Sequence, residues 1–163
     1  MITTTDDVSW RDLFEPQEIG TTLVLTVGNL FRSDDGVGPF IAKHVPHPRG
    51  HIRILDAGDK PENCIDRATE LKPVRSVIID AADFGGRPGE IRLIPEEAIP
   101  DTMLSTHTFP LRIIAKILAE DTGSPVFFLG IQPKTMDFGE GLSPEIRSAA
   151  DEIVRMLSAK IQL

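Results

Sequence analysis

The chain has 163 residues, which is typical of one domain with a core large enough to fold without disulfides, and we expect a single domain over residues 1–163. Its formal net charge is −8 and it contains no basic run, which argues against nucleic acid or an anionic membrane surface as a partner. No apolar stretch approaches the roughly 18 residues of a membrane span, and the N-terminus lacks the basic-then-apolar order of a secretion signal, so we expect a cytoplasmic protein.

The one cysteine, Cys64, excludes an internal disulfide and a Cys-x-x-Cys metal site. It falls on the apolar face of a predicted helix, which favours a position in the core. Any bound metal would therefore have to be held by histidine, aspartate or glutamate side chains.

Residues 1–20 form an N-terminal extension to a body over residues 22–158. Trp10, Leu13 and Phe14 fall on one helical face, so we expect a short amphipathic helix packed on the body. The alternative is an arm that docks a partner, which is less favoured because tryptophan side chains are usually buried.

The stretch from residue 23 to residue 45 predicts a buried strand, a loop and a helix. Asp34 and Asp35 occupy the loop, where the N-terminus of a helix would otherwise attract an anion. The glycine spacing also does not match the dinucleotide-binding or P-loop motifs, so we expect this loop to bind a cation. The alternative is that one Asp caps the helix and the other is solvated, which we accept for one of the pair rather than for both.

The rest of the chain alternates strands and helices. We expect further strands over 52–55, 74–80, 90–94 and 126–131, and helices beginning near Pro61, after Pro110 and at Pro144, with Ser143 as the last cap. Residues 95–103 are expected to be irregular or one helical turn. The pattern predicts an α/β three-layer sandwich with helices on both faces of a five-stranded, mainly parallel sheet, in which strand 4 is antiparallel because no helix precedes it.

Ligand-type side chains converge at the carboxyl ends of the predicted strands, where open α/β sheets bind ligands. They are Asp35 with its neighbour Asp34, Asp80 at the end of strand three, and His107 before a helix. Asp80 alone could merely turn the chain, and a single histidine is more often structural or exposed. Together, two carboxylates and an imidazole suit a divalent metal with open coordination positions. The other histidines lie away from this edge and are not expected to be ligands: His44, His47 and His51.

Six motifs resemble, in order, those of the nickel–iron hydrogenase maturation endopeptidases, and most closely the branch that processes the large subunit of formate-hydrogenlyase-type hydrogenases. The resemblance covers roughly residues 22–158. The motifs are Gly28-Asn29-Leu30-x-x-x-Asp34-Asp35-Gly36-Val37-Gly38, Asp59-Lys60-Pro61-Glu62-Asn63, Ile78-Ile79-Asp80-Ala81-Ala82-Asp83, Pro88-Gly89-Glu90-Ile91-Arg92, Thr106-His107-Thr108-Phe109-Pro110-Leu111 and Phe128-Leu129-Gly130-Ile131-Gln132-Pro133.

The resemblance implies the same three-layer fold and a metal-contacting, catalytic set of Asp35, Asp80 and His107. The family often has Glu where Asp35 stands, and most members lack a counterpart of the first twenty residues. Asp34 could orient a ligand, while Asn29 and the glycines at 28, 36 and 38 would shape the loop.

The activity that the resemblance implies is an aspartic-type endopeptidase. It would remove the C-terminal extension from the large-subunit precursor of a nickel–iron hydrogenase after nickel insertion. Ser33 and Ser105 have no neighbouring base in the sequence, so no serine nucleophile is evident. We therefore expect metal-centred chemistry in which the nickel-loaded precursor carries the nickel, and any other divalent metal binds the same site only adventitiously.

Two alternatives stay open. The first is a receiver-type phosphoacceptor domain that uses Asp80, Thr106 and Lys134, although its acidic pair would lie six residues beyond Gly28 and His107 would have no role. The second is a metallopeptidase of this fold with another protein substrate, as in the related spore-germination proteases.

Overall fold

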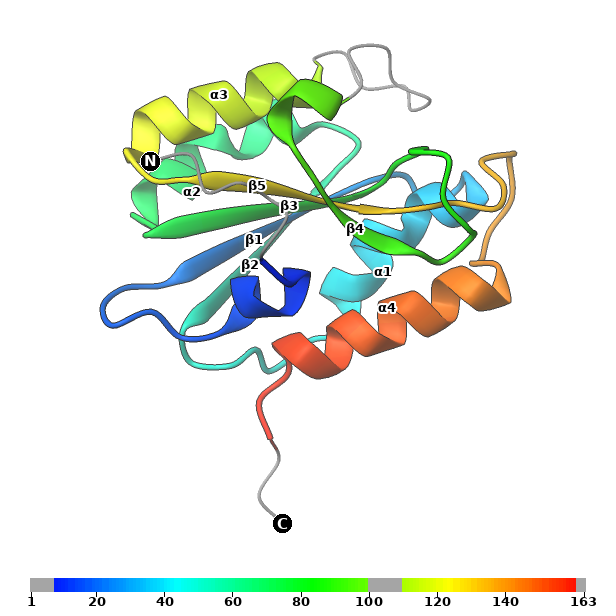
Figure 1. Cartoon of the computed structure of the whole chain (residues 1–163), viewed down its shortest axis with the longest axis horizontal. Helices are drawn as coiled ribbons and strands as arrows, with labels where there is room; N and C mark the ends of the chain where they lie inside the picture. The colour runs from blue at the N-terminus through cyan, green and yellow to red at the C-terminus, as the bar shows by residue number, and fades with distance from the viewer. Residues whose placement is uncertain (1–7, 100–109, 161–163) are drawn as a thin grey trace.

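A five-stranded sheet forms the middle of the molecule (Figure 1). The computed structural model describes residues 8–99 and 110–160. The strand order is β2-β1-β3-β5-β4, and β4 alone is antiparallel to its neighbour. The predicted mixed sheet is thereby confirmed, with strand ends shifted by a few residues. The strands are β1 (Thr22–Val27), β2 (Ile52–Gly58), β3 (Arg75–Ala81), β4 (Ile91–Ile94) and β5 (Val126–Ile131).

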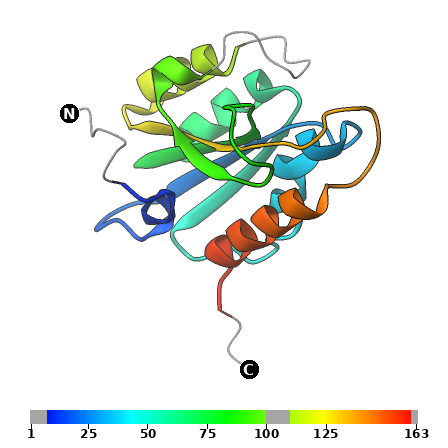
Figure 2. The ribbon, with the colours of Figure 1, turned by 45° about the vertical axis from the view of Figure 1, so that its right-hand side comes forward.

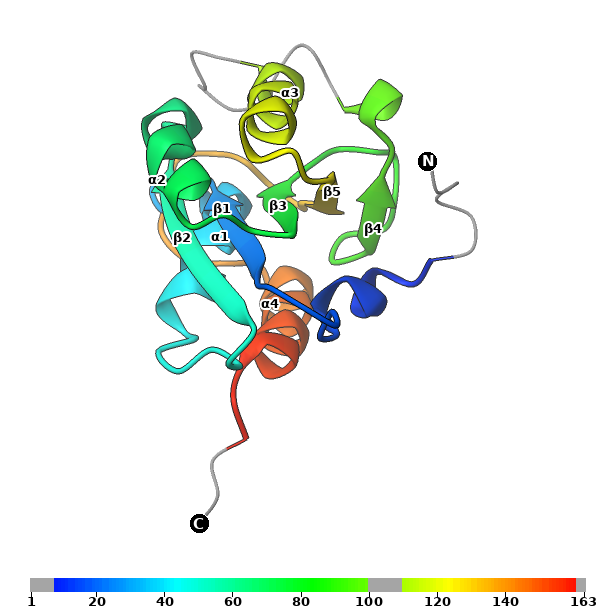
Figure 3. The same cartoon turned by 90° about the vertical axis from the view of Figure 1, so that its left-hand side faces the viewer.

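Helices cover both faces of this sheet, as Figure 3 shows from the side. Helices α1 and α4 lie on one face, and α2 and α3 on the other, so the predicted three-layer sandwich is confirmed. None of the described helices is long and apolar enough to cross a membrane. The helices are α1 (Val37–Lys43), α2 (Ile65–Glu70), α3 (Leu111–Thr122) and α4 (Pro144–Leu157).

The central strand β3 contributes to both cores because successive side chains point to opposite faces of a sheet. Val77 and Ile79 pack in the core beneath α1 and α4, whereas Ile78 packs in the core with Leu111 of α3. By this alternation Asp80, at the end of the strand, lies on the face that α3 covers. The alternation of side chains along the strand therefore decides which layer of helices this carboxylate faces.

The N-terminal extension packs on the α1 and α4 face through a 3-10 helix, η1 (Trp10–Phe14). Leu13 and Phe14 are buried in the core, and half-buried Trp10 meets the ring of Phe14 edge-on with 6.2 Å between centroids. The Ser9 hydroxyl accepts a hydrogen bond from the backbone N–H of Arg11. The described part of the extension, from residue 8 onward, thus packs as expected, although its helix is a short 3-10 turn.

Three further 3-10 turns refine the predicted boundaries: η2 (Ser33–Gly36) before α1, η3 (Pro61–Cys64) before α2, and η4 (Glu96–Ala98) after β4. Asp34 and Asp35 therefore lie in a helical turn and not in an open loop. The single helical turn expected within residues 95–103 is η4, and residues 100–103 lie outside the described residues. Cys64 is half-buried at the margin of the α3 core, which is less buried than predicted.

Candidate functional site

The turn from β1 into α1 is folded tightly against the end of the sheet. Gly28 has a φ of +148°, and a Cβ there would lie 1.9 Å from the backbone oxygen of Asp35. A Cβ on Gly38 would lie 2.4 Å from the backbone oxygen of Val27, so α1 begins in direct contact with β1. Because only glycine permits this approach, η2 lies on the carboxyl edge and contacts β3.

Asp35 is buried in this turn, with 1% of its surface exposed. The backbone N–H of Asn29 donates to its Oδ2 at 3.0 Å, and the side-chain oxygen of Asn29 accepts from the N–H of Phe31 at 2.9 Å. Asn29 therefore shapes the loop as predicted, and its backbone also fixes the orientation of the Asp35 carboxylate.

Asp80 lies near the end of β3 and is also 1% exposed. It is paired with Gly130 of β5, and its Oδ1 accepts from the N–H of Ala81 at 2.8 Å. Since η2 contacts β3, Asp35 and Asp80 come from adjoining elements at the same edge of the sheet. The structure thus brings together the neighbourhoods of two predicted site residues that are 45 positions apart in the sequence.

The third predicted ligand, His107, lies outside the described residues, as does Ser105. Within the described ranges, no three His, Cys, Asp or Glu side chains are grouped in a way that could hold a metal. The described chain resumes at Pro110, and Leu111 then packs in the same core as Val27 and Ile78. The metal set predicted from the sequence therefore stays a prediction.

Asp34 has a different role from its neighbour, because its carboxylate holds the loop between β5 and α4. The buried Oδ2 accepts from the N–H groups of Lys134 at 2.9 Å and Thr135 at 3.0 Å, and from the Ser143 hydroxyl at 2.9 Å. Its Oδ1 accepts from the N–H of Ser143 at 2.7 Å. The N-cap position of α1 is occupied by Gly36, so neither Asp stands at the capping position that was expected for one of them. Backbone donors about a hundred positions away use the carboxylate instead.

Ser143 occupies the N-cap position of α4 and Pro144 its first turn, as predicted. The Ser143 hydroxyl makes no capping bond within the helix and donates to Asp34. The capping residue thus ties the start of α4 to the β1–α1 turn.

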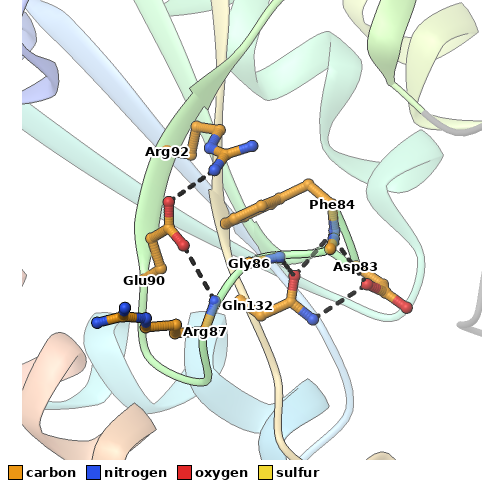
Figure 4. Close-up of polar contacts among 8 residues, drawn as sticks. Asp83, Phe84, Gly86, Arg87, Glu90, Arg92 and Gln132 are labelled. Carbon is orange, nitrogen blue, oxygen red and sulfur yellow. Dashed lines mark hydrogen bonds and ion pairs between the residues drawn. The ribbon is translucent and has the colours of Figure 1, made fainter.

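Gln132, which follows β5, organises the loop after Asp80 (Figure 4). Its buried side-chain oxygen accepts from the N–H groups of Phe84 at 2.9 Å and Gly86 at 3.1 Å, and its Nε2 donates to Asp83 Oδ1 at 3.1 Å. The N–H of Gly85, and after it the Gln132 amide, lower the pKa of Asp83 below its ordinary value. Sequence reasoning missed this role because only the adjacency of β3 and β5 reveals it.

The same loop is closed by Glu90, whose carboxylate accepts from Arg92 at 2.7 Å and from the N–H of Arg87 at 3.0 Å (Figure 4). The Arg92 hydrogen bond, followed by the Arg87 N–H, lowers the pKa of Glu90. The Arg92 guanidinium also lies 4.4 Å from the centroid of the Phe84 ring. The loop following Asp80 is thus fixed at both of its ends.

Other possible nucleophiles have structural surroundings. Burial, and then the carboxylates of Asp56 and Glu62, raise the pKa of the Cys64 thiol, which disfavours the reactive thiolate. The Ser33 hydroxyl donates to the backbone oxygen of Asp137 at 2.7 Å. Among the described contacts, neither side chain has the basic partner that an activated nucleophile needs.

The remaining histidines make local contacts. His44 stacks on Phe40 at a centroid distance of 3.9 Å, and its Nδ1 lies 2.8 Å from the Phe40 backbone oxygen. His51 Nε2 lies 2.7 Å from the backbone oxygen of Phe14, and His47 is exposed. These positions agree with the prediction that none of the three belongs to the site.

The receiver-type alternative has no support in the described residues. The lysine that it requires, Lys134, forms an ion pair with Glu145 at 3.1 Å. The acidic pair that it requires does not act together, because the Asp34 carboxylate accepts hydrogen bonds from the backbone N–H groups of the β5–α4 loop. Thr106 lies outside the described residues.

Comparison with known proteins gives one consistent result. A family model described as hydrogenase maturation protease, HycI, matches residues 42–160. The hydrogenase 3 maturation protease of Escherichia coli K12 is 40% identical over 139 residues, covering 84% of this chain and 88% of that protein. A crystal structure of the hydrogenase 3 maturation protease superposes with a TM-score of 0.74 at 38% identity, covering 85% of this chain and 90% of the other.

A further solved structure shows the same likeness. The crystal structure of a [NiFe] hydrogenase maturation protease HycI from Thermococcus kodakarensis KOD1 has a TM-score of 0.77 at 29% identity and covers 90% of this chain and 94% of that chain. These matches support neither the receiver alternative nor a peptidase with an unrelated substrate. Sequence motifs, fold and comparisons therefore agree, and the chain belongs to the hydrogenase maturation protease family and is an endopeptidase.

Proposed function

We propose that this endopeptidase removes the C-terminal extension from the large-subunit precursor of a nickel–iron hydrogenase after nickel has been inserted, and that it does so in the cytoplasm. Membership of the maturation protease family supports hydrogenase processing as the task. The high likeness to the hydrogenase 3 maturation protease supports a hydrogenase of that branch as the substrate.

The observation that carries the proposal is the burial of two carboxylates, Asp35 and Asp80, on adjoining elements at the carboxyl edge of the sheet. Burying a carboxylate is costly, so two of them at one edge favour a site that receives positive charge. His107 is proposed as the third member. It lies three positions before Pro110 in the sequence, a separation that a fully extended chain spans with at most about 11 Å.

Two carboxylates and one imidazole suit a divalent metal of borderline character, but three side chains leave its coordination incomplete. In this proposal the nickel belongs to the substrate, and Asp35, Asp80 and His107 complete its coordination. Such contact would position the adjoining peptide bond, and a divalent metal there can polarise a carbonyl or lower the pKa of water. Specificity would follow because the enzyme needs both the nickel and the protein segment that bears it. Another divalent metal would bind here only adventitiously.

The first test replaces the proposed site residues. Purified Asp35→Asn, Asp80→Asn and His107→Ala variants are incubated with nickel-loaded precursor, and the mature subunit is followed by its mass. We expect all three to lose processing, while the matched controls Asp83→Asn and His47→Ala keep it. Processing at the wild-type rate by any of the three, with folding verified by circular dichroism, would remove that residue from the site.

The second test concerns the source of the metal. Chelator-treated enzyme should still process nickel-loaded precursor, and untreated enzyme should leave nickel-free precursor intact. An enzyme that carries stoichiometric zinc, loses activity with it and cuts nickel-free precursor equally well would contradict the proposal of a substrate-borne metal.

A further inference from the structure

Two loops at the carboxyl edge of the sheet expose large apolar side chains beside the proposed site. In the β1–α1 turn, Leu30 is 48% and Phe31 is 64% exposed, and in the β5–α4 loop Phe138 is 88% exposed. We call these three residues the aromatic lip. A large apolar side chain that is mostly exposed contributes little to folding by burial, so a group of such side chains at one place is typical of an interaction surface.

Hydrogen bonds join the two loops into one surface. The N–H of Gly139 donates to the backbone oxygen of Phe31 at 2.9 Å, and the N–H of Ser33 donates to that of Gly139 at 2.8 Å. The Arg32 guanidinium lies 5.5 Å from the centroid of the Phe138 ring. Figure 2 shows the β5–α4 loop, in orange, running beside the segment that leads into α1. The lip therefore presents its side chains from a fixed backbone, which lowers the entropic cost of binding.

The lip is continuous with the proposed site. Asn29, the residue before Leu30, donates to the Asp35 carboxylate, and the carboxylate of Asp34 holds the loop that carries Phe138. A segment that reached Asp35 from this side of the molecule would therefore pass the lip.

The charges around the lip indicate which partner fits it. Asp137 and Glu140, on either side of Phe138, are carboxylates at the surface. The nearby cations are Arg32, which lies over the Phe138 ring, and Lys134, which is paired with Glu145. The two surface carboxylates therefore outnumber the one cation that lies against the lip. A second copy of the chain would bring these carboxylates near their own counterparts and is disfavoured, because the whole chain carries a net charge of −8. A segment with both apolar and basic side chains complements the surface.

We propose that the aromatic lip docks the segment of the hydrogenase large-subunit precursor next to the scissile bond, and that this segment presents apolar side chains together with lysine or arginine. The inference rests on the proposed function, since it takes the precursor as the substrate. The lip binds substrate in this account, and it takes no part in the chemistry at Asp35 and Asp80.

The test compares Phe31→Ser/Phe138→Ser with wild type in steady-state processing of nickel-loaded precursor. We expect KM to rise by about tenfold or more, with kcat changed by less than about twofold, because uniform binding is lost. The conservative Phe31→Leu/Phe138→Leu variant should recover most of the loss. Ile19→Ser is the matched control, because Ile19 is 82% exposed and precedes β1, outside the lip.

A second variant tests the charge of the partner. Asp137→Asn/Glu140→Gln should weaken precursor binding about threefold or more at low ionic strength and should reduce its salt dependence, because exposed charges steer association and are screened by salt. If binding by this variant and by wild type depends equally on salt, the docked precursor segment does not present lysine or arginine to these carboxylates, and that part of the proposal is wrong.

The outcomes separate the two proposals. If wild type does not process the precursor, the proposed function fails. If wild type processes it and the serine variant has an unchanged KM, only the docking surface fails. Sedimentation that shows a dimer of wild type, dissociated by Phe138→Ser, would instead assign the lip to a second copy of the chain and overturn the proposal.

Discussion

Asp34 and Ser143 are 109 positions apart in the sequence and are joined by two hydrogen bonds, from the Ser143 N–H to Oδ1 at 2.7 Å and from its hydroxyl to Oδ2 at 2.9 Å. With the N–H groups of Lys134 and Thr135 also bound to Oδ2, this carboxylate fixes the β5–α4 loop against the β1–α1 turn. The two adjacent aspartates of the turn therefore divide their roles, Asp34 holding a loop and Asp35 lying at the proposed site.

Replacing Asp34 by Asn should destabilise the fold. The amide keeps one acceptor oxygen but loses the charge, and its NH2 group must face backbone donors, so we expect a loss of about 2 to 4 kcal/mol in the free energy of unfolding. Urea denaturation measures the loss. Asp137→Asn, at the surface of the same loop, is the control and should change stability by less than about 0.5 kcal/mol. Equal stability of both variants would show that the Asp34 contacts contribute little.

Gly28→Ala should disrupt the turn that carries Asp35. A Cβ at 1.9 Å from the Asp35 backbone oxygen forces a backbone shift, and the φ of +148° is strained for alanine, so we expect a loss of more than about 2 kcal/mol together with loss of processing. Thermal unfolding and precursor processing measure both effects. A Cβ on Gly50 would meet no atom of the described residues within 4 Å, and Gly50→Ala should change stability by less than about 1 kcal/mol. A Gly28→Ala variant with wild-type melting temperature would contradict the close approach.

Phe14→Ala should destabilise the protein because Phe14 is fully buried in the core beneath α4. The expected loss is about 3 to 5 kcal/mol, the range for truncating a buried phenylalanine. Processing measured at low temperature should survive, since the extension packs on the α1 and α4 face. Ile19→Ala, at an exposed position near Phe14 in sequence, is the comparison and should melt as wild type does. Loss of precursor binding without a change in melting temperature would make the extension a docking arm.

Alkylation of Cys64 should be slow at neutral pH. Burial and the neighbouring carboxylates raise the pKa of the thiol, so the reactive thiolate fraction is small and should increase only at a pH above the ordinary thiol range. The rate of reaction with iodoacetamide as a function of pH measures this shift against a cysteine peptide. The Cys64→Ala variant should process precursor normally. A correctly folded Cys64→Ala variant that cannot process precursor would show that the thiol takes part in the reaction.

Gln132→Leu should raise the pKa of Asp83 toward its ordinary value, because the Gln132 amide is the second largest cause of the lowering after the Gly85 N–H. A carboxylate with a lowered folded pKa stabilises the fold above its unfolded pKa, near about 4, and this contribution is lost as the pH falls through the folded value. The variant should therefore lose less stability than wild type on acidification across that range. NMR titration of the side-chain carboxyl groups measures the pKa values of Asp83 and Glu90. Glu90 is the internal control, and its pKa should stay low because Arg92 holds it. A Gln132→Leu variant in which the pKa of Asp83 is unchanged would show that the amide does not stabilise the carboxylate.

Much of the fold was determined by local sequence patterns. The continuous apolar run of Val77-Ile78-Ile79 requires a strand covered on both faces, and Pro144 after Ser143 sets the start of α4. The absence of a helical pattern between the third and fourth strands sufficed to place β4 antiparallel. The alternation of strands and helices also fixes where the strand ends meet. It was therefore enough to locate the acidic pair and Asp80 at the carboxyl edge of the sheet.

Tertiary structure alone decided how those carboxylates are used. Asp34 and Asp35 are adjacent in sequence and have the same side chain. Asp34 finds its donors only where the chain returns, at Lys134, Thr135 and Ser143. Likewise, the sequence alone assigns no contact to the Gln132 side chain. Its hydrogen bond from the Phe84 N–H forms because β5 lies beside β3. Local sequence specifies which backbone groups need partners, but hydrogen bonds between distant loops depend on where the sheet brings those loops together.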